Sequence, residues 1–203
     1  MHPNPAFRSE DRARHVEFAR DRAFGVLALS ADGTPLLSHL PFLLSEDGAV
    51  AELHLVRSNP IIRALSTPQE VKIAVQGPDA YISPDWYGVE DQVPTWNYIA
   101  VHLSGELELR PQEELLDLLN RQSAFYEGRL LPKPPWATGK MSEQALARMM
   151  RMIVPCRMHV QDVQGTWKLG QNKPDEVRFA AADHVPDGFG IEPRQLAALM
   201  RKA

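Results

Sequence analysis

The 203-residue chain contains a single cysteine, Cys156, so it can form neither an internal disulfide nor a zinc site built from several cysteines. It has no apolar run near the roughly 20 residues that are needed to span a bilayer. Basic residues are not in excess, because 22 Lys and Arg stand against 26 Asp and Glu, for a net charge of −4. These absences argue against a disulfide scaffold, a membrane-spanning protein and nucleic-acid binding through bulk positive charge.

The sequence also lacks the short motifs of several enzyme classes. Its seven histidines form no His-x-His and no His-Glu-x-x-His pattern, which argues against a zinc hydrolase. There is no Gly-x-Ser-x-Gly elbow and no Gly-x-x-x-x-Gly-Lys-Ser/Thr loop. We therefore assign no metal ligand and no catalytic residue, and we expect Cys156 to be a buried strand residue. Nothing at the N-terminus resembles a signal peptide, which favours a cytoplasmic protein.

Proline is abundant, with 17 residues, and it separates segments of regular hydrophobic pattern. The pattern predicts strands over 24–30, 36–43, 50–57, 70–76, 80–83, 95–109 and 153–168. It predicts helices over 9–23, 60–65, 111–128, 142–152 and 192–202. Ser9 is expected to cap the first helix, Asp32-Gly33 to form a turn, and residues 84–94 to form an irregular loop.

Antiparallel strands joined by short turns, with helices grouped after them, indicate an α+β fold. Closing the six or seven strands into a small barrel with flanking helices would remove the exposed sheet edges. We expect one domain over residues 1–203, with helical additions at about 111–152 and 173–203.

A candidate anion site lies where the third predicted strand ends. Strand alternation places Leu53, Leu55 and Arg57 on one face, so a guanidinium ends an apolar row and needs an anionic partner. Ser58 or Asn59 then caps a helix whose first turn offers free N–H groups. A phosphate or carboxylate pocket and an arginine paired with a surface acid are equally good interpretations.

The segment Ser38–Phe42 lies on the neighbouring strand. Pro41 within it suggests an edge or a ligand-facing position, because proline cannot donate to the sheet. If the two strands pair through a turn at 45–48, Ser38 and His39 lie opposite residues 54–57. For His39 alone, a histidine in the barrel wall is the simpler interpretation.

Two further segments carry ligand chemistry. Tyr81–Tyr87 and Val93–Tyr98 concentrate aromatic side chains in a chain that is only 7% aromatic, which suits a planar heteroaromatic ring or a dimer interface. Gly165–Pro174 holds two lysines and two side-chain amides near a strand end. Such donors suit an anion or a carbonyl-rich ring, and a solvated polar turn is the alternative.

Taken together, these segments resemble the PaiB-like family of FMN-binding negative transcriptional regulators. The matching stretches occur in the family's order and are Ser38–Phe42, His54–Pro60, Tyr81–Tyr87, Val93–Tyr98 and Gly165–Pro174. The resemblance implies a split β-barrel related to flavin-binding oxidoreductases, usually a homodimer with FMN near the subunit interface. One departure is Gly170, where the family's Lys-Leu-Ser-Gln-Asn pattern has a serine, so that one local hydrogen bond is not expected.

The resemblance also implies which residues contact the cofactor. Three would lie near the FMN phosphate, namely Arg57, Ser58 and Asn59. Three would lie along the flavin, namely Ser38, His39 and Leu40. Another group would approach the flavin, namely Thr95, Trp96 and Asn97. A last group would approach it from the same or the other subunit, namely Lys168, Gln171 and Asn172.

The expected function is that of an FMN-binding negative transcriptional regulator or flavin-dependent sensor. An FMN-dependent oxidoreductase acting on a small molecule or a nicotinamide cofactor is the alternative, and it ranks second because no acid–base pair is evident. Direct DNA binding stays open without support from the sequence. We find no convincing helix-turn-helix, and the basic patch of Arg148, Arg151 and Arg157 is small.

Overall fold

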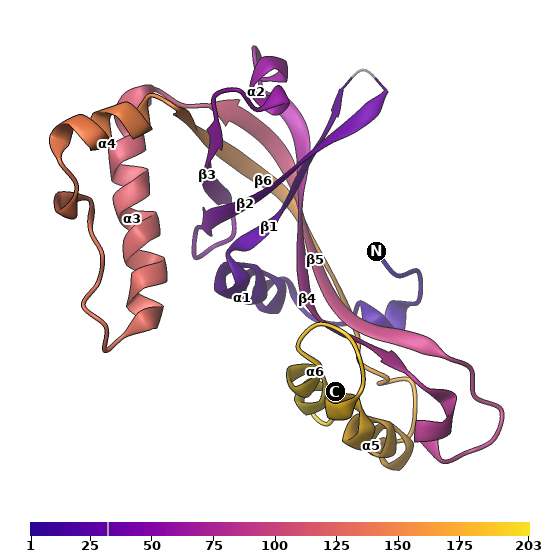
Figure 1. Cartoon of the computed structure of the whole chain (residues 1–203). Helices are drawn as coiled ribbons and strands as arrows, with labels where there is room; N and C mark the ends of the chain where they lie inside the picture. Colours follow the sequence, from indigo (N-terminus) through magenta and orange to yellow (C-terminus); the bar gives the residue numbers. More distant parts are fainter. Residues whose placement is uncertain (32) are drawn as a thin grey trace. The chain divides into compact units, whose positions relative to one another are not determined.

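The structure, a computed structural model, describes residues 1–31 and 33–203 (Figure 1). Its contacts group the chain into two compact units. Unit 1 contains Met1–Phe18, Val75–His102 and Val163–Ala203, and unit 2 contains Ala19–Ala74 and Leu103–Asp162. Three long strands contribute residues to both units: β4 (Gln69–Ile82), β5 (Thr95–Leu109) and β6 (Ile153–Lys168).

Six antiparallel strands form a closed barrel in the order β1-β2-β3-β6-β5-β4. The first three are β1 (Phe24–Ala31), β2 (Thr34–Leu44) and β3 (Val50–Val56). Because successive side chains of a strand point to opposite faces, alternate residues fill the barrel, among them Leu27, Phe42, Leu53, Leu103 and Met158. The α+β fold with a six- or seven-stranded split barrel is therefore confirmed, with six strands.

The register of the barrel places the predicted segments. Leu27 of β1 pairs with Ser38 of β2, and Phe42 of β2 pairs with Leu53 of β3. Leu53 in turn pairs with Cys156 of β6, which is buried as expected. The predicted strands over 95–109 and 153–168 match β5 and β6. The predicted turn at Asp32-Gly33 falls partly outside the described residues, because these do not include Asp32.

The predictions of two separate strands at 70–76 and 80–83 are wrong, because β4 continues from Gln69 to Ile82. The Gly77-Pro78 pair interrupts the hydrophobic pattern without ending the strand. Beyond it, the N–H groups of Asp79 and Tyr81 donate to the carbonyls of Ile191 and Phe189, at 2.9 and 3.2 Å. These acceptors lie more than a hundred residues away in the sequence, so local pattern alone does not show that the strand continues.

Most helices begin and end near their predicted positions. They are α1 (Arg12–Arg22), α2 (Pro60–Ala64), α3 (Leu115–Glu127), α4 (Glu143–Met150), α5 (Asp175–His184) and α6 (Pro193–Met200). Short 3₁₀ turns cover Pro5–Phe7, Pro84–Tyr87, Gln112–Glu114, Gly128–Leu130, Thr138–Lys140 and Val185–Asp187. None of the helices in residues 1–31 and 33–203 is long and apolar enough to cross a membrane.

Two helical features differ from the predictions. The cap of α1 is Asp11 rather than Ser9, because Asp11 Oδ1 accepts a hydrogen bond from the Arg14 N–H at 2.8 Å. Helix α5 was not predicted, since its buried face consists of Arg178, Ala181 and Ala182 rather than large apolar residues. Such a face produces a weak hydrophobic period.

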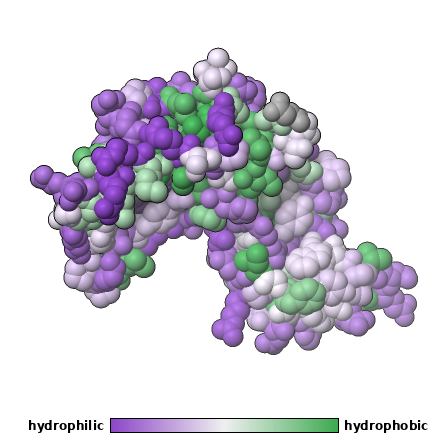
Figure 2. Space-filling view, turned by 45° about the horizontal axis from the view of Figure 1, so that its top comes forward, coloured by the Kyte–Doolittle hydropathy of each residue, from purple (hydrophilic) through white to green (hydrophobic). Residues whose placement is uncertain are grey.

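The core of unit 1 is built where α5 and α6 cover the strand segments of that unit. Its buried residues include Ile82, Ile99, Trp167, Val185 and Leu196. In unit 2, α3 buries Leu115, Leu118 and Gln122, and Ser142 caps α4 by accepting a hydrogen bond from the Ala145 N–H. The face in view in Figure 2 is mainly hydrophilic, with a few hydrophobic patches.

Candidate functional site

In unit 2, Arg57 lies immediately after β3, and within the described part of the chain its guanidinium donates only to neutral oxygens. Nε donates to the carbonyl of Arg151 at 3.0 Å, and Nη2 donates to Gln112 Oε1 at 2.9 Å. Nη2 also lies 3.4 Å from the carbonyl of Ile153. These bonds hold an exposed guanidinium in place and leave its charge available to an anion. They are not bonds to the surface acid of the alternative interpretation.

Asn59 connects Arg57's strand end to the neighbouring strand. Its Oδ1 accepts from the Ile61 N–H at 3.0 Å and thereby caps α2, so of the two predicted caps Asn59 is the one that is used. Its Nδ2 donates to Ser38 Oγ at 3.1 Å. The structure therefore brings together Ser38 and Asn59, whereas the guanidinium of Arg57 bonds to Gln112, Arg151 and Ile153. The exposed Ser58 lies between Arg57 and Asn59 in the chain.

His39 and Leu40 have different surroundings from Ser38. His39 is exposed and, because strand residues alternate, points to the face opposite Ser38. Leu40 is only 3% exposed and packs in the core of the barrel. Its side chain is therefore unable to lie along a ligand, and only its main chain is available for such a contact.

In unit 1, a cavity of about 490 Å³ gathers most of the remaining predicted residues. Its lining includes Thr95 and Asn97 at the start of β5, Lys168 at the end of β6, and Asn172 in the turn beyond. Asn97 is 1% exposed on the apolar face of β5, where its Nδ2 approaches the sulfur of Met200 at 3.6 Å.

Two lysines give this cavity a positive character. Lys168 Nζ donates to Thr95 Oγ1, and Lys173 Nζ donates to Gln92 Oε1 and lies 4.2 Å from the centre of the Tyr87 ring. Burial lowers the pKa of Lys168, and the neighbouring Lys173 lowers it further. Both lysines are bonded to neutral oxygens, so they can serve an anionic or carbonyl-rich ligand.

One carboxylate, Asp91, also lines the cavity. Several of the lining residues were not predicted, namely Lys173, Gln92, His2 and Asn4. His2 reaches the end of β6 because its N–H donates to Thr166 Oγ1 at 3.1 Å. No sequence pattern links residues 164 positions apart, whereas Lys173 could have been found from its place in the segment Gly165–Pro174.

Trp96 and Gln171 do not line the cavity. Trp96 is 43% exposed and packs edge-on against Tyr81 and Phe189, at 6.4 and 5.6 Å between ring centres. Gln171 is occupied by the main chain, since its Oε1 accepts from the Leu169 N–H at 2.8 Å and its Nε2 donates to the Trp167 carbonyl at 2.5 Å. Gln171 therefore shapes the turn that presents the cavity residues.

Gly170, where a serine was expected, lies at a φ of 83° in this same turn. Side chains are disfavoured in this left-handed region, and glycine is not. The departure from the family pattern is thus accompanied by a backbone conformation that suits glycine.

Comparisons with solved structures agree with the fold. The FAD and heme binding protein from Mycobacterium smegmatis superposes with a TM-score of 0.59 at 16% identity, covering 91% of this chain and 82% of that one. The flavocytochrome Anf3 from Azotobacter vinelandii superposes with a TM-score of 0.55 at 16% identity, covering 82% of this chain and 72% of that one. At this level of identity the likeness shows the split-barrel fold.

Sequence comparisons show the family. Residues 1–162 match the family model described as "Putative FMN-binding domain". The chain is 31% identical over 185 residues to "Protease synthase and sporulation protein PAI 2" of Bacillus subtilis, covering 90% of this chain and 88% of that protein. An uncharacterized protein of Aspergillus fumigatus is 27% identical over 224 residues, covering 85% of this chain and 84% of that protein. The chain belongs to the PaiB-like family of FMN-binding split-barrel proteins, and FMN is the cofactor that this membership assigns to it.

Proposed function

We propose that this protein is an FMN-binding negative transcriptional regulator or flavin-dependent sensor. The observation that carries the proposal is the exposed Arg57 guanidinium, which is held by the neutral oxygens of Arg151 and Gln112. A fixed guanidinium with a serine hydroxyl next to it in the chain is suited to a phosphate. The expected free N–H groups at the start of α2 are not there, because Pro60 has none and those of Ile61 and Ile62 donate to Asn59. Membership of the FMN-binding family names the ligand that carries this phosphate.

The phosphate end of FMN fits the residues of unit 2. Arg57 would supply the charge-assisted hydrogen bonds, and Ser58 would supply a hydroxyl. Asn59 would position Arg57 and Ser58, because it caps α2 and its amide donates to Ser38. The main chain of His39 and Leu40 would lie along the flavin.

The cavity of unit 1, considered by itself, suits a carbonyl-rich ring such as that of a flavin. Lys168 and Asn172 offer side-chain donors to the carbonyl-rich edge of the ring, and Thr95 orients Lys168. Asn97, which is buried and bonded to the Met200 sulfur, would form part of the cavity wall. Gln171 would act by holding the turn, and Trp96 would add aromatic surface beside it. A volume of about 490 Å³ lies within the usual range for cofactor pockets. Each of the two groups, taken by itself, offers donors of a kind that suits part of FMN.

Bound FMN would supply hydride and electron transfer, and the residues of this chain would bind, orient and shield it. In a sensor, a change in the redox state of the flavin would alter its contacts with these same residues and so change the conformation of the protein. We further propose that the chain works as a cytoplasmic homodimer in which residues 1–203 form one FMN-binding domain. The net charge of −4 does not support direct binding to DNA.

The proposal is tested by adding FMN to the purified protein and separating bound from free flavin by gel filtration. We expect flavin to co-elute with the protein, with its visible absorption shifted and its fluorescence quenched. Free flavin alone in the small-molecule fraction, with unchanged fluorescence, would reject the proposal.

A second candidate, an FMN-dependent oxidoreductase, is favoured by one observation. The pKa of Lys168 is lowered by burial, which brings this ammonium group closer to the range in which it can donate a proton to a ligand in the cavity. Oxidation of a reduced nicotinamide by the protein with FMN, clearly faster than by free FMN, would support this candidate. The rate should fall in Lys168→Met. A wild-type rate equal to that of free FMN would reject the oxidoreductase candidate.

A further inference from the structure

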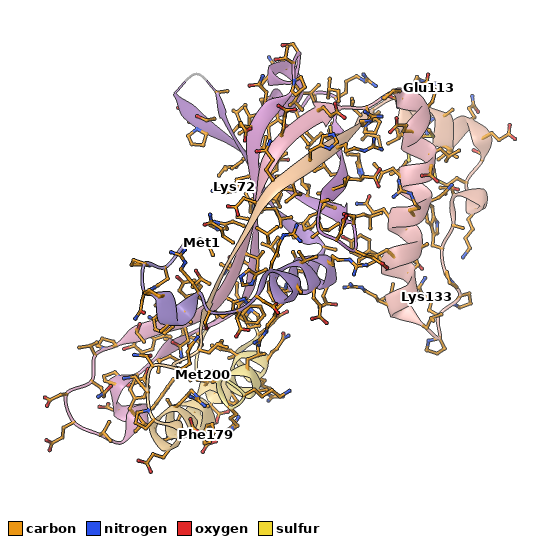
Figure 3. All side chains as sticks on the ribbon, turned by 180° about the vertical axis from the view of Figure 1, so that it is seen from behind. Met1, Lys72, Glu113, Lys133, Phe179 and Met200 are labelled. Atoms are coloured by element: carbon orange, nitrogen blue, oxygen red, sulfur yellow. The ribbon has the colours of Figure 1, made fainter. Side chains whose placement is uncertain are left out.

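A second cavity, of about 320 Å³, lies in unit 2 and shares no residue with the proposed cofactor contacts. Its walls come from β2, β3, α3 and the connection that follows α3, which contribute Pro41, His54, Gln122 and Trp136 among others. Figure 3 shows α3 in unit 2, with Glu113 labelled just before it and Lys133 in the connection after it.

One face of α3 lines the cavity. Leu119, Gln122, Ser123 and Tyr126 follow the spacing i, i+3, i+4 and i+7, which places them on the same side of a helix. Gln122 is only 6% exposed and continues the buried row that begins at Leu115. An apolar residue such as leucine is usual at a buried position of this kind, whereas Gln122 places a polar amide there.

Two buried polar atoms of residues that line the cavity have no hydrogen-bond partner among the described residues: Gln122 Nε2 and His54 Nδ1. Buried polar atoms in proteins are nearly always paired with protein groups, ligands or ordered water. Burial lowers the pKa of His54, and a side-chain hydrogen bond with Gln122 opposes this effect in part, so the two side chains are neighbours. The ring is therefore neutral near pH 7, and a neutral imidazole offers one lone pair and one N–H.

The rest of the lining is mainly apolar, with Ser123 and Glu127 as further polar residues. Pro41 lines the cavity, and His54 pairs in register with Pro155, so the imidazole lies among proline neighbours. Trp136 is held in place because its N–H donates to Glu127 Oε2 at 2.8 Å, and the same carboxylate accepts from Lys133 Nζ. These bonds anchor the connection against the end of α3 and set the indole against the cavity.

We propose that this cavity binds a small planar molecule that carries a carboxamide or lactam group. The ligand carbonyl accepts a hydrogen bond from Gln122 Nε2, and the ligand N–H donates to the lone pair of His54 Nδ1. Its ring packs against Pro41, Leu119 and Trp136. The volume of about 320 Å³ suits a ligand of this size. None of its lining residues is a proposed FMN contact, and it would give the protein a second small-molecule binding site.

The test uses the full chain with FMN added and benzamide as the probe, followed by NMR of side-chain N–H groups. We expect benzamide to shift the Gln122 amide and the Trp136 indole signals saturably. Toluene, which has the same ring without the amide, should leave the Gln122 signal unchanged. Gln122→Leu should weaken benzamide binding about tenfold or more, since one hydrogen bond to a buried amide is lost. The matched control Gln195→Leu, on the exposed face of α6, should leave it unchanged.

His54→Phe provides a second variant that keeps a ring and removes Nδ1, and it should also weaken benzamide binding. The proposal is overturned if benzamide causes no saturable shift in the wild type. It is also overturned if both variants bind benzamide as the wild type does, or if a crystal soaked with benzamide shows only water bridging Gln122 and His54. Flavin absorbance is read in the same samples, so a failure of FMN binding is recognised separately.

Discussion

Trp167 Nε1 donates a hydrogen bond to His15 Nδ1 over 3.1 Å inside unit 1. The imidazole must be neutral to accept it, with its proton on the other nitrogen. Burial lowers the pKa of His15, and Glu10 and Asp11 raise it by a smaller amount, while Arg14 lowers it. One buried histidine thus links the charge state of the protein to the packing of its N-terminal helix on β6.

This contact predicts an acid-sensitive stability. The unfolded chain has the ordinary histidine pKa of 6.5, and the folded pKa is lower, so the unfolded state takes up the proton first as the pH falls. The free energy of unfolding should therefore decrease below about pH 6.5. His15→Asn keeps an acceptor that does not titrate, so its urea unfolding should depend less on pH between neutral pH and about pH 5. Equal pH dependence in both proteins would contradict this explanation.

Residue types predicted part of the candidate site. Arg57 and Asn59 were found because a guanidinium at a strand end and a cap are local features. Lys168 was found from its donor-rich segment. His2 and Gln92 were missed, since they reach the cavity only after the termini and loops have folded around it. Contacts across such distances in the sequence leave no periodic signal.

At the scale of elements, α2 depends on its cap. Asn59→Ala should cost about 1 kcal/mol of folding free energy, because the Ile61 N–H loses its acceptor. Asn59→Asp keeps the acceptor and loses the donor to Ser38. It should therefore retain stability in urea unfolding and weaken FMN binding, because its carboxylate would repel the phosphate. If the Asp variant bound FMN as tightly as the wild type, the Asn59 cap would not lie near the phosphate.

The approach of β5 to β6 in unit 2 depends on Gly105. A Cβ at this position would lie 2.0 Å from the carbonyl oxygen of His159, so one strand would have to move. Gly105→Ala should therefore destabilise the protein by about 1–3 kcal/mol in chemical unfolding. The control is Gly128→Ala, where a Cβ meets no described atom within 4 Å. Equal stability of the two variants would show that the strands are not held this closely.

The elements with strong period were predicted almost to the residue, as β5 and β6 show. The errors arose where distant residues decide the structure. β4 continues past Gly77-Pro78 because residues 189–191 bond to it, and α5 packs through alanines that carry little hydrophobic signal. Tertiary contacts overrode local pattern in both cases.

At the scale of the whole molecule, both units expose large apolar side chains, and in unit 1 two of these are aromatic rings that pack on each other. Val93 is 73% exposed, Phe189 is 62% exposed and Trp96 is 43% exposed. The three lie in unit 1, and Trp96 and Phe189 contact each other. Aromatic surface of this kind is typical of interfaces, which supports the proposed homodimer.

Sedimentation should therefore give a mass twice the 22.8 kDa of the chain. Trp96→Ser should shift the protein toward monomer, since aromatic anchors contribute most of the binding energy of an interface. Leu116→Ser, at a residue that is 39% exposed on α3 in unit 2, is the control and should leave the dimer intact. A monomeric wild type at all concentrations would contradict the dimer proposal.

The central claim is that Arg57 binds the phosphate of FMN, and it is tested most directly by comparing FMN with riboflavin, which has no phosphate. The wild type should bind FMN more tightly than riboflavin in a fluorescence titration. Arg57→Ala should lose about 1.5–3 kcal/mol of FMN binding, and its riboflavin affinity should not change. The control Arg148→Ala removes the same charge from the exposed face of α4 and should have no effect. If Arg57→Ala kept the full preference for FMN over riboflavin, the phosphate would have to be bound by other residues.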